Sequence, residues 1–437
     1  MSKVFPKVLI VGYPFDMKTG GGITMSNLFQ DWPKDKLALV SNANLLSNPD
    51  ISVCRILYQL GYSNKLHPFP LGLILPEIKT GIVEISAAEK DTYSTNKIVP
   101  GRYRTVYKIL FTLLHFFGIY NLIYKLKITP EFREWLTIFN PDVIYSQLST
   151  LELIRFVNEV HTLTGKPLVI HMMDDWPVTI NKPGLFSFYW GRVIEKEFRQ
   201  LLDKSSVLMS ICDTMSEEYK IRYNKDFLSF HNPIDTNFWM PYSKTDYAVK
   251  NKFTVLYAGR ISQGIKESIK DIASAVNKVF IDNPDIMLEI QTSDISELNK
   301  VIQFNDHITW VKPKDYRELP VKFSGADLLV LPYDFDNKSI DFLRFSFSTK
   351  ISEFMISGTP ILVYADKQTA MAKYALKDKW AYVVTENRPE KLVNAIRNLY
   401  SDIKLRKRLG ERAKELAIKN EDSQTVRERF RKCFIIN

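Results

Sequence analysis

Short apolar runs recur along the first half of the chain, separated for the most part by longer stretches with a helical pattern of apolar positions. The runs are "KVLIVGYPF", "LALVSN", "DVIYSQ", "PLVIHMMD", "SVLMSIC" and "DFLSFHN". Near-continuous apolar strands that alternate with amphipathic helices are typical of a parallel sheet covered by helices. The pattern predicts an α/β domain.

The same pattern begins again in the second half. Its strand-like runs are "FTVLYAGR", "IMLEIQTS", "HITWVKP", "LLVLPYD", "PILVYAD" and "AYVVTEN", with helical stretches such as "GIKESIKDIASAVNKVF" between them. We predict two Rossmann-like domains, because a chain of 437 residues can bury two cores. The predicted boundaries are 1–240 for the first domain, 241–251 for a polar linker, 252–418 for the second domain and 419–437 for a C-terminal helix that packs back on the first domain.

The segment "GRYRTVYKILFTLLHFFGIYNLIYKLK", residues 101–127, is apolar and aromatic in the middle and basic at both ends. A membrane-spanning helix needs roughly 20 apolar residues without breaks, whereas this segment contains Thr112, His115 and Asn121. Basic ends and aromatic flanks also suit a helix that lies in the bilayer interface. A helix buried in the first domain fits the same pattern, so peripheral membrane contact and burial both stay open.

The chain carries a formal net charge of +10 at pH 7. This excess favours an anionic partner, such as a nucleotide, a phosphorylated lipid, a bilayer surface or a nucleic acid. The sequence contains no helix-turn-helix, zinc-finger, RNP or KH signature, so we expect no nucleic-acid partner.

Three widely separated cysteines, Cys54, Cys212 and Cys433, provide no metal-ligand spacing and no disulfide framework. A reducing compartment is the simpler interpretation. The apolar run near the N-terminus is too short for a secretion signal. We therefore expect a cytoplasmic protein, either free or at the inner face of the cell membrane.

A glycine-rich turn, "TGGGITMSNLF", follows the first predicted strand. Gly21 and Gly22 allow a tight turn, and a helix that begins near Ile23 would present free N–H groups to an anion. The turn matches neither G-x-G-x-x-G nor a P-loop. A phosphate contact and a plain strand-to-helix turn are both compatible with it.

A second turn of this kind, "YAGRISQGIKES", opens the second domain. Arg260 follows a strand and Lys266 opens the next helix, so the two cations can converge on a diphosphate at the helix N-terminus. The alternative is a pair of solvated surface charges. Because parallel sheets bind ligands at the carboxyl ends of their strands, we expect both turns to lie in a cleft between the domains.

The stretch "FSTKISEFMISGTP" predicts a helix that Gly358 and Pro360 end. Ser348, Thr349 and Lys350 lie at its start, and Glu353 lies one turn in on the same side as the lysine. A carboxylate there can accept both hydroxyls of a ribose while the lysine binds a phosphate. The alternative is a capping box with an ordinary Lys–Glu surface pair.

Together, "TGGG", "HMMDDWP", "HNPIDTNFW", "AGR" with a following lysine, and "TKISEFMISGTPIL" resemble the retaining GT-B glycosyltransferases of family-4 type, the glycosyl transferases group 1, over nearly the whole chain. "HNPID" is similar to the N-G-x-D segment that closes their first domain. The resemblance implies an α/β GT-B fold, with two Rossmann-like domains that face each other across a cleft. It also implies that Arg260 and Lys266 bind the nucleotide diphosphate, although Lys266 is one position off the usual spacing, and that Glu353 binds the ribose.

Two further positions follow from the resemblance. The family commonly has a second glutamate eight positions before the ribose glutamate, and Phe345 stands there in this chain. Asp341, Ser346 or backbone N–H groups would have to replace it. In "VIHMMDDWP" the family has a histidine or an acid beside the reacting sugar, which Asp174 matches best, with His171 and Asp175 on the acceptor side. The alternative is a buried His171 and an Asp175 that caps a turn.

The implied activity is transfer of a sugar, with retention of configuration, from a nucleotide-diphosphate sugar to a saccharide or lipid-linked acceptor. The implied pathway is the synthesis of a cell-surface polysaccharide or glycolipid. Arg260, Lys266 and Lys350 would stabilise the departing diphosphate, and Asp174 would orient the acceptor hydroxyl. The resemblance implies no cofactor and no metal. A sugar-nucleotide epimerase and a non-catalytic scaffold remain alternatives. Loops such as Gly61–Pro100 would select the acceptor.

Overall fold

Contacts divide the chain into two compact units. Unit 1 consists of residues 1–230 and 427–437, and unit 2 consists of residues 231–426. The chain therefore enters unit 2 ahead of the predicted linker and returns to unit 1 within the predicted C-terminal segment. The computed structural model describes residues 4–17, 19–42, 49–65, 79–83, 101–179 and 184–436, without the side chains of 101–108 and 179.

Unit 1 contains an eight-stranded sheet in the order β4-β3-β2-β1-β5-β6-β7-β8. All neighbouring strands are parallel except the edge strand β4, which pairs antiparallel with β3. The six apolar runs of the first half form strands, as predicted. The strands are β1 (Val8–Val11), β2 (Leu37–Asn42), β3 (Ile56–Leu60), β4 (Gly81–Val83), β5 (Val143–Ser146), β6 (Leu168–Met172), β7 (Val207–Ser210) and β8 (Leu228–Ser229).

The sequence analysis did not predict β3 and β4. A polar residue, Gln59, interrupts the apolar run of β3 but is buried in the structure. Its side-chain amide donates a 2.7 Å hydrogen bond to the carbonyl oxygen of Lys79, two residues before β4. The amide nitrogen of this side chain therefore has a partner inside the protein, but the partner comes from a distant segment and could not be inferred from the local pattern.

The helices of unit 1 begin and end at residues suited to those positions. Thr150 caps α5 by accepting a 3.1 Å hydrogen bond from the Leu153 nitrogen, and Gly165 ends the same helix in the left-handed conformation, with φ 63°. The helices are α1 (Gly20–Phe29), α2 (Gly101–Phe116), α3 (Tyr120–Ile123), α4 (Pro130–Phe139), α5 (Leu151–Thr164), α6 (Trp176–Thr179), α7 (Ser187–Lys204) and α8 (Asp213–Tyr223).

Unit 2 contains a six-stranded, fully parallel sheet in the order β11-β10-β9-β12-β13-β14. Every apolar run predicted in the second half forms one of these strands. The elements are α9 (Thr236–Trp239), β9 (Phe253–Ala258), α10 (Lys266–Phe280), β10 (Ile286–Gln291), α11 (Ile295–Leu298), β11 (Ile308–Val311), α12 (Leu319–Gly325), β12 (Leu328–Pro332), α13 (Asn337–Leu343), α14 (Ile351–Ile356), β13 (Ile361–Tyr364), α15 (Ala370–Asp378), β14 (Tyr382–Val384), α16 (Pro389–Ser401) and α17 (Ile403–Asn420). The last helix, α18 (Ser423–Lys432), begins in unit 2 and ends in unit 1.

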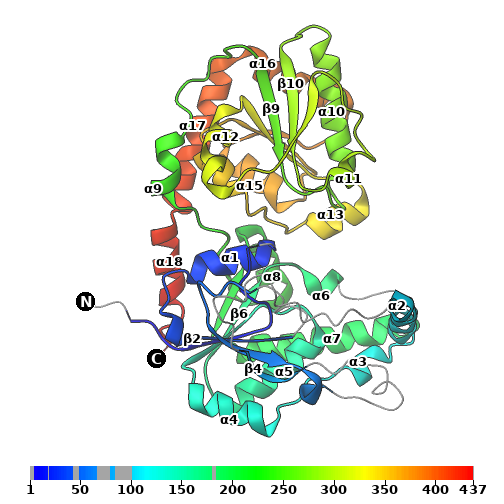
Figure 1. Ribbon diagram of the computed structural model, residues 1–437, viewed down its shortest axis with the longest axis vertical. Helices are drawn as coiled ribbons and strands as arrows, with labels where there is room; N and C mark the ends of the chain where they lie inside the picture. Colours follow the sequence, from blue (N-terminus) through cyan, green and yellow to red (C-terminus); the bar gives the residue numbers. More distant parts are fainter. Residues whose placement is uncertain are drawn as a thin grey trace. The chain divides into compact units, whose positions relative to one another are not determined.

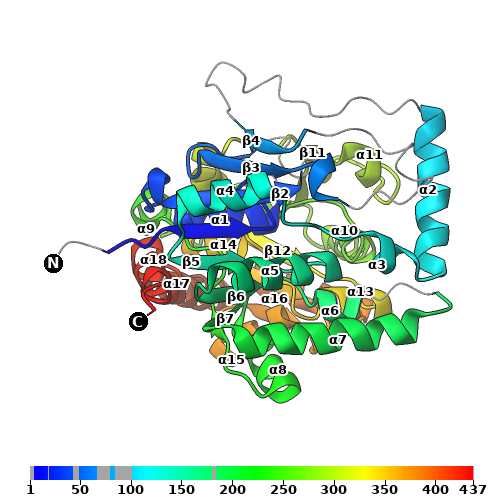
Figure 2. The same cartoon turned by 90° about the horizontal axis from the view of Figure 1, so that it is seen from below.

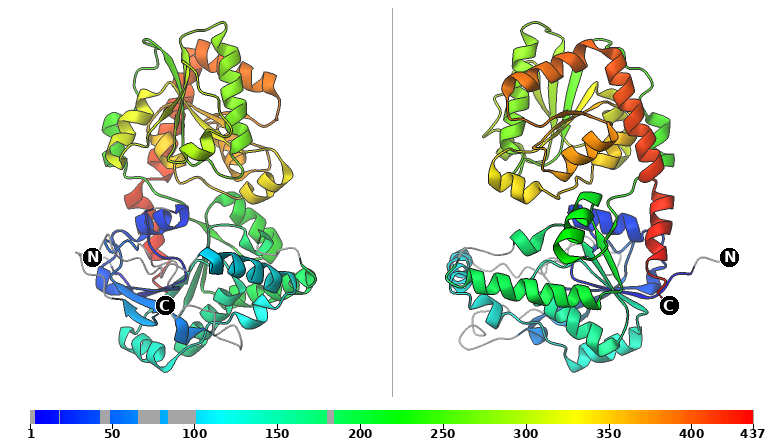
Figure 3. Two further views of the ribbon diagram at one scale, coloured as in Figure 1. Left: turned by 45° about the vertical axis from the view of Figure 1, so that its right-hand side comes forward. Right: turned by 180° about the vertical axis from the view of Figure 1, so that it is seen from behind.

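Helices cover both faces of the sheet of unit 2 (Figure 3). Apolar side chains are buried between the sheet and the helices on each side. Alternate residues of β9 point to opposite sides: Val255 and Tyr257 join a core with α10 and α16, whereas Leu256 and Ala258 join a core with α12, α14 and α15. Two covered faces explain why these strands read as continuous apolar runs. The prediction of two Rossmann-like domains is confirmed.

The last helix packs on unit 1, as predicted (Figure 1). Phe430 and Phe434 are buried, and their rings lie 5.0 and 5.6 Å from the ring of Phe29 in α1. Arg431 donates a 2.6 Å hydrogen bond to the carbonyl oxygen of Val4 near the N-terminus. The apolar end of the chain thus completes the core of the first unit.

The segment α2–α3 lies at the rim of unit 1 beside the beginning of α7 (Figure 2). The inner side of α2 contributes Leu114, which is buried, and Phe111, whose ring lies 5.5 Å from Tyr124. The opposite side of the helix is exposed. Within the described residues, no helix has both the length and the apolar character that crossing a membrane requires.

Candidate functional site

The sheet of unit 2 has a topological switch point between β9 and β12. The chain continues from β9 to β10 on one side and from β12 to β13 on the other. In open α/β sheets, such a divergence leaves a crevice at the carboxyl ends of the strands, where ligands bind. The predicted donor residues of the second domain all lie in the segments that follow these two strands, Gly259–Lys266 and Tyr333–Glu353.

Arg260 and Lys266 flank the loop between β9 and α10. Arg260 is exposed, and its carbonyl oxygen accepts a 2.6 Å hydrogen bond from the hydroxyl of Tyr257. Lys266 forms an ion pair with Glu297. Glu297 also pairs with Lys300, and the two lysines lower the pKa of its carboxyl group to about 2. A diphosphate at Lys266 would therefore have to share this lysine with a carboxylate that the sequence analysis did not identify.

A buried carboxylate, Asp334, joins the two sides of the switch point. It follows β12, and its Oδ1 accepts a 2.7 Å hydrogen bond from the backbone nitrogen of Ser268 in the first turn of α10. The Asp334 nitrogen donates to the carbonyl oxygen of Gly264 at 2.7 Å. Burial raises the pKa of Asp334. Because Asp334 already occupies part of the helix N-terminus, positive side chains have more to contribute to anion binding here than free N–H groups.

Glu353 is the most perturbed carboxyl group of the predicted donor site. It lies in the first turn of α14, and Lys350 is the N-cap residue of that helix. Burial raises the pKa of Glu353 to about 7, and the charge of Lys350 offsets only part of this shift. A carboxyl group that is costly to ionise and lies at a switch point is a strong candidate for a ligand contact.

The beginning of α14 is held by the segment in which the chain enters unit 2. The side-chain amide of Asn232 donates a 3.0 Å hydrogen bond to the carbonyl oxygen of Thr349, and the Asn232 carbonyl oxygen accepts a 2.9 Å hydrogen bond from Ser352. Ser352 Oγ also lies 3.0 Å from Glu421 Oε2, and the Glu421 carboxylate pairs with His231. The sequence singled out "HNPID" only by resemblance, and the structure gives it a physical role in positioning α14.

The capping-box alternative for α14 is wrong. No side chain caps this helix, and Ser348 Oγ instead accepts a 3.3 Å hydrogen bond from the backbone nitrogen of Lys350. Thr349 is half-buried, with its carbonyl oxygen bound to Asn232. Gly358 ends the helix with φ 72°, a conformation that favours glycine, as the sequence predicted.

Phe345, at the position where the family commonly has a second glutamate, belongs to the core. Its side chain is 2% exposed, and the guanidinium of Arg344 lies 5.1 Å from its ring centroid. Asp341 is exposed and Ser346 is half-buried on the same segment. An apolar, buried Phe345 leaves no room for a carboxylate to reach a sugar from this position.

The glycine-rich turn of unit 1 opens α1 at Gly20, earlier than predicted. Thr19 caps the helix by accepting a 3.0 Å hydrogen bond from the Gly22 nitrogen, and Asp16 accepts a 2.7 Å hydrogen bond from the Thr19 hydroxyl. A Cβ atom on Gly22 would clash with the carboxylate of Asp16, whereas one on Gly21 would lie 3.4 Å from Gln147 Oε1. Gly22 is thus required by local packing, which favours the plain-turn interpretation at that position.

His171 lies in the core of unit 1, which confirms the alternative interpretation of this residue. It is 0% exposed. Its Nδ1 lies 2.8 Å from the Tyr145 hydroxyl and its Nε2 lies 3.1 Å from the carbonyl oxygen of Phe230. Burial lowers the pKa of His171 to about 4, so the ring is neutral near pH 7. Both ring nitrogens have partners inside the protein, and a direct contact with an acceptor is not available to this side chain.

Asp174 and Asp175 follow β6, but their environments differ. Asp175 accepts hydrogen bonds of 2.8 Å from the Tyr219 hydroxyl and 2.9 Å from Arg222, and these contacts tie the strand end to α8. Asp175 also directly precedes α6, and its carbonyl oxygen accepts a 3.1 Å hydrogen bond from the Val178 nitrogen, so the turn-cap interpretation stays compatible with the structure. Asp174 is exposed, and nearby groups still desolvate its carboxyl group enough to raise its pKa. Of the two, only Asp174 has the exposure that a contact with an acceptor requires.

Most of the loop expected to select the acceptor, Gly61–Pro100, lies outside the described residues. In the part of the chain that the structure describes, no three His, Cys, Asp or Glu side chains come close enough together to hold a metal ion.

Several solved structures share the fold of this chain. Anabaena HepE in complex with UDP has a TM-score of 0.59 and 13% sequence identity, with 98% of each chain covered. Sucrose-phosphate synthase from Thermosynechococcus elongatus has a TM-score of 0.61 and 12% identity, again with 98% of each chain covered. WaaG, a glycosyltransferase involved in lipopolysaccharide biosynthesis, has a TM-score of 0.58 and 11% identity over 98% of this chain and 100% of its own. The GT-B fold class is confirmed.

The sequence itself also matches a family. No curated protein matches the chain, but residues 243–416 match the family described as Glycosyl transferases group 1. The matched region runs from before β9 into α17 and includes Arg260, Lys266, Lys350 and Glu353. It also includes the switch point between β9 and β12. Residues 243–416 are therefore similar to the glycosyl transferases group 1, and the resemblance seen in the sequence is confirmed for this part of the chain.

Proposed function

We propose that the protein is a glycosyltransferase that transfers a sugar from a nucleotide-diphosphate sugar to a saccharide or lipid-linked acceptor, with retention of anomeric configuration. The observation that carries this proposal is that Glu353 and Lys350 both lie at the beginning of α14, in the segment after β12 at the switch point, which Arg260 and Lys266 also flank. A carboxylate for the ribose hydroxyls and several cations for the diphosphate are the two kinds of group that a donor of this class needs.

The proposed chemistry places fixed positive charge at the leaving group. When the bond from the sugar to the diphosphate breaks, negative charge grows on the phosphate oxygens, and Arg260, Lys266 and Lys350 would stabilise it more strongly in the transition state than in the bound substrate. These cations would do the work that a divalent metal does in metal-dependent transferases. Asp174 is proposed to orient the acceptor hydroxyl. The pathway, a cell-surface polysaccharide or glycolipid synthesis, is supported only by the family resemblance.

A panel of nucleotides tests the donor site. The panel contains UDP, GDP, ADP and CMP with their sugar conjugates, and HepE in complex with UDP-glucose makes the uridine compounds the first to test. We expect one nucleotide to raise the melting temperature of the wild type. We expect Glu353→Ala to weaken its binding about tenfold or more, because the variant loses hydrogen bonds to a charged acceptor.

Glu390 supplies a matched control for this panel. Like Glu353, it lies in the first turn of a helix of unit 2, but it is exposed on α16. Glu390→Ala should bind the nucleotide as the wild type does. If no nucleotide binds, or if both alanine variants bind equally well, the donor-site assignment is contradicted.

Donor binding should depend on pH through Glu353. The carboxyl group is protonated below about pH 7 in the folded protein, and only the ionised form accepts a hydrogen from each ribose hydroxyl. We expect a nucleotide sugar to bind about tenfold more weakly at pH 6 than at pH 8. Calorimetry with the sugar conjugate measures this without interference from the ligand, because its diphosphate does not titrate in that range. In Glu353→Gln this dependence should disappear, and an unchanged pH profile would contradict the assignment.

The raised pKa of Glu353 also makes the stability of the folded protein depend on pH when no ligand is bound. The pKa of Glu353 is raised from 4.5 to about 7, so its contribution to the stability of the folded state is fully present below pH 4.5 and is lost as the pH rises through 7. A bound nucleotide compensates for this loss, because it provides hydrogen-bond donors to the ionised group.

A non-catalytic scaffold is the second candidate, because the buried Phe345 stands where relatives have a glutamate. Turnover distinguishes the two functions. A transferase releases the nucleoside diphosphate from its donor, slowly to water and faster when a suitable acceptor is added, whereas a scaffold binds the nucleotide without releasing the sugar.

A further inference from the structure

One side of α2 exposes apolar side chains to solvent. Ile109, Leu113 and Phe116 are 57%, 48% and 45% exposed, and their spacing places them on one face of the helix. The opposite face packs on unit 1 through Leu114 and Phe111. Both the inner face and the outer face of α2 therefore carry apolar residues.

The beginning of α7 extends this apolar surface. Leu185, Phe186, Phe188 and Tyr189 are between 53% and 70% exposed. The backbone nitrogen of Leu185 donates a 2.9 Å hydrogen bond to the carbonyl oxygen of Phe116, so the two segments are in direct contact. We call these four residues, together with Ile109, Leu113 and Phe116, the α2–α7 surface. Soluble proteins rarely expose so many large apolar side chains in one place without a binding role.

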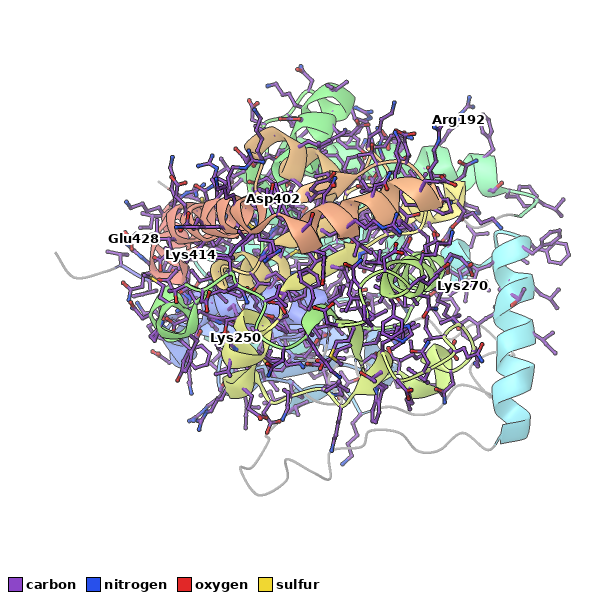
Figure 4. All side chains as sticks on the ribbon, turned by 90° about the horizontal axis from the view of Figure 1, so that it is seen from above. Arg192, Lys250, Lys270, Asp402, Lys414 and Glu428 are labelled. Carbon is purple, nitrogen blue, oxygen red and sulfur yellow. The ribbon has the colours of Figure 1, made fainter. Side chains whose placement is uncertain are left out.

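The charged side chains within the two segments that form the α2–α7 surface are all positive, and the nearest carboxylates come from α5 and from later in α7, where Glu197 is paired with Arg155 and Glu195 with Arg199. The sequence of residues 101–127 and 180–192 contains no aspartate or glutamate. Arg192 is one of the cations whose side chain the structure describes. Its guanidinium lies 4.1 Å from the ring centroid of Phe188 and extends outwards from α7 (Figure 4). The cationic residues of the two segments are Arg102, Arg104, Lys108, Lys125, Lys127, Lys182 and Arg192.

We propose that the α2–α7 surface binds an anionic lipid bilayer, with α2 and the beginning of α7 lying in the interface between the headgroups and the acyl chains. Exposed aromatic and aliphatic side chains on segments whose own charged residues are all cations match the two layers of such an interface. The cations meet anionic headgroups, while the apolar side chains enter the outer part of the hydrocarbon. A protein partner with an apolar, acidic groove is the competing occupant, and the vesicle experiment distinguishes it from a bilayer.

This inference does not depend on the proposed sugar transfer. The α2–α7 surface lies in unit 1, whereas the nucleotide-binding residues lie in unit 2. If the protein does transfer sugar, a bilayer surface is where it would meet a lipid-linked acceptor. Membrane binding and nucleotide binding can nevertheless be measured separately, so the failure of one proposal is distinguishable from the failure of the other.

Co-sedimentation of the full chain with vesicles tests the proposal. The probes are vesicles of phosphatidylcholine alone and vesicles in which about one third of the lipid is phosphatidylglycerol. We expect the wild type to bind the anionic vesicles and to dissociate as salt is raised. The triple variant Phe186→Ser, Phe188→Ser, Tyr189→Ser should lower the partition coefficient about tenfold or more, and Arg192→Glu should lower it about fivefold.

Two exposed residues elsewhere provide the matched control. Ile221 in α8 and Ile281 after α10 are 83% and 79% exposed, so the double variant Ile221→Ser, Ile281→Ser removes comparable apolar surface and should bind vesicles as the wild type does. The melting temperature and the nucleotide affinity of each variant verify that it is folded. The proposal is overturned if the wild type does not bind anionic vesicles, if both sets of serine variants lose binding equally, or if the triple variant instead converts a dimer of the chain into a monomer.

Discussion

Replacing Arg260 with alanine should lower kcat for release of the nucleoside diphosphate from the donor about a hundredfold or more, with a much smaller effect on KM. Arg260 is exposed at the carboxyl end of β9, in the loop that Lys266 closes. A guanidinium can bind two phosphate oxygens at once and is always charged. Its contribution is largest in the transition state, where the phosphate oxygens carry the most charge, so the loss appears in kcat.

Two further variants make this measurement decisive. Arg260→Lys keeps the charge but not the two-pronged geometry, and we expect it to recover only part of the rate. Arg317→Ala removes an exposed arginine of the same unit that lies away from the switch point, in the segment before α12, and it should have wild-type kinetics. Full activity in Arg260→Ala would show that the leaving group is stabilised elsewhere.

Replacing Gly410 with alanine should destabilise unit 2 and weaken nucleotide binding at the same time. Gly410 lies in α17, and a Cβ atom there would overlap the carbonyl oxygen of Gly358 and lie 2.8 Å from the ring of Tyr247. Gly358 directly follows the helix that carries Glu353, and α17 packs against that helix. The clash is with backbone, so α17 has to move away from α14.

The expected loss is about 2–3 kcal/mol, in the range of other overpacked sites. For a unit of this size, such a loss lowers the melting temperature by roughly 4–10 °C. The direction of the change in melting temperature is informative. Alanine is the better helix former by about 1 kcal/mol and would stabilise α17 if the clash were absent.

Gly325 gives the matched control for this variant. It is the last residue of α12, and nothing lies within 4 Å of the position where its Cβ atom would be. Gly325→Ala should leave the melting temperature unchanged or slightly higher. Equal melting temperatures for Gly410→Ala and the wild type would contradict the close approach of α17 to the end of α14.

The strands and the fold class followed from local pattern. The runs that became β9, β12 and β13 are apolar throughout because both faces of the sheet are covered, and this kind of burial is visible in the sequence. Gly358 and Pro360 correctly predicted the end of α14, because a left-handed glycine followed by proline cannot continue a helix. The start of α1 was less predictable, because three glycines in succession give no local preference for a helix.

Some residues of the candidate site could be identified from the sequence, and others could not. Arg260, Lys266, Lys350 and Glu353 were identified because each lies next to a strand end or a helix start that the pattern had already placed. Their partners were not identified. Glu297, which pairs with Lys266, and Asp334, which caps α10, come from other strand ends.

The two α/β domains, the strand ends and the types of charged group at those ends could be inferred from the amino-acid sequence, because they depend on periodicity and on residues close together in the chain. Which of those charged groups are engaged within the protein depends on the folded structure. His171 and Asp175 look like acceptor-side candidates in the sequence, but one is buried against Tyr145 and the other is paired with Arg222. Pairing and burial arise from segments that are distant in sequence, and it is these contacts that leave Asp174 exposed and shift the pKa of Glu353 towards neutrality.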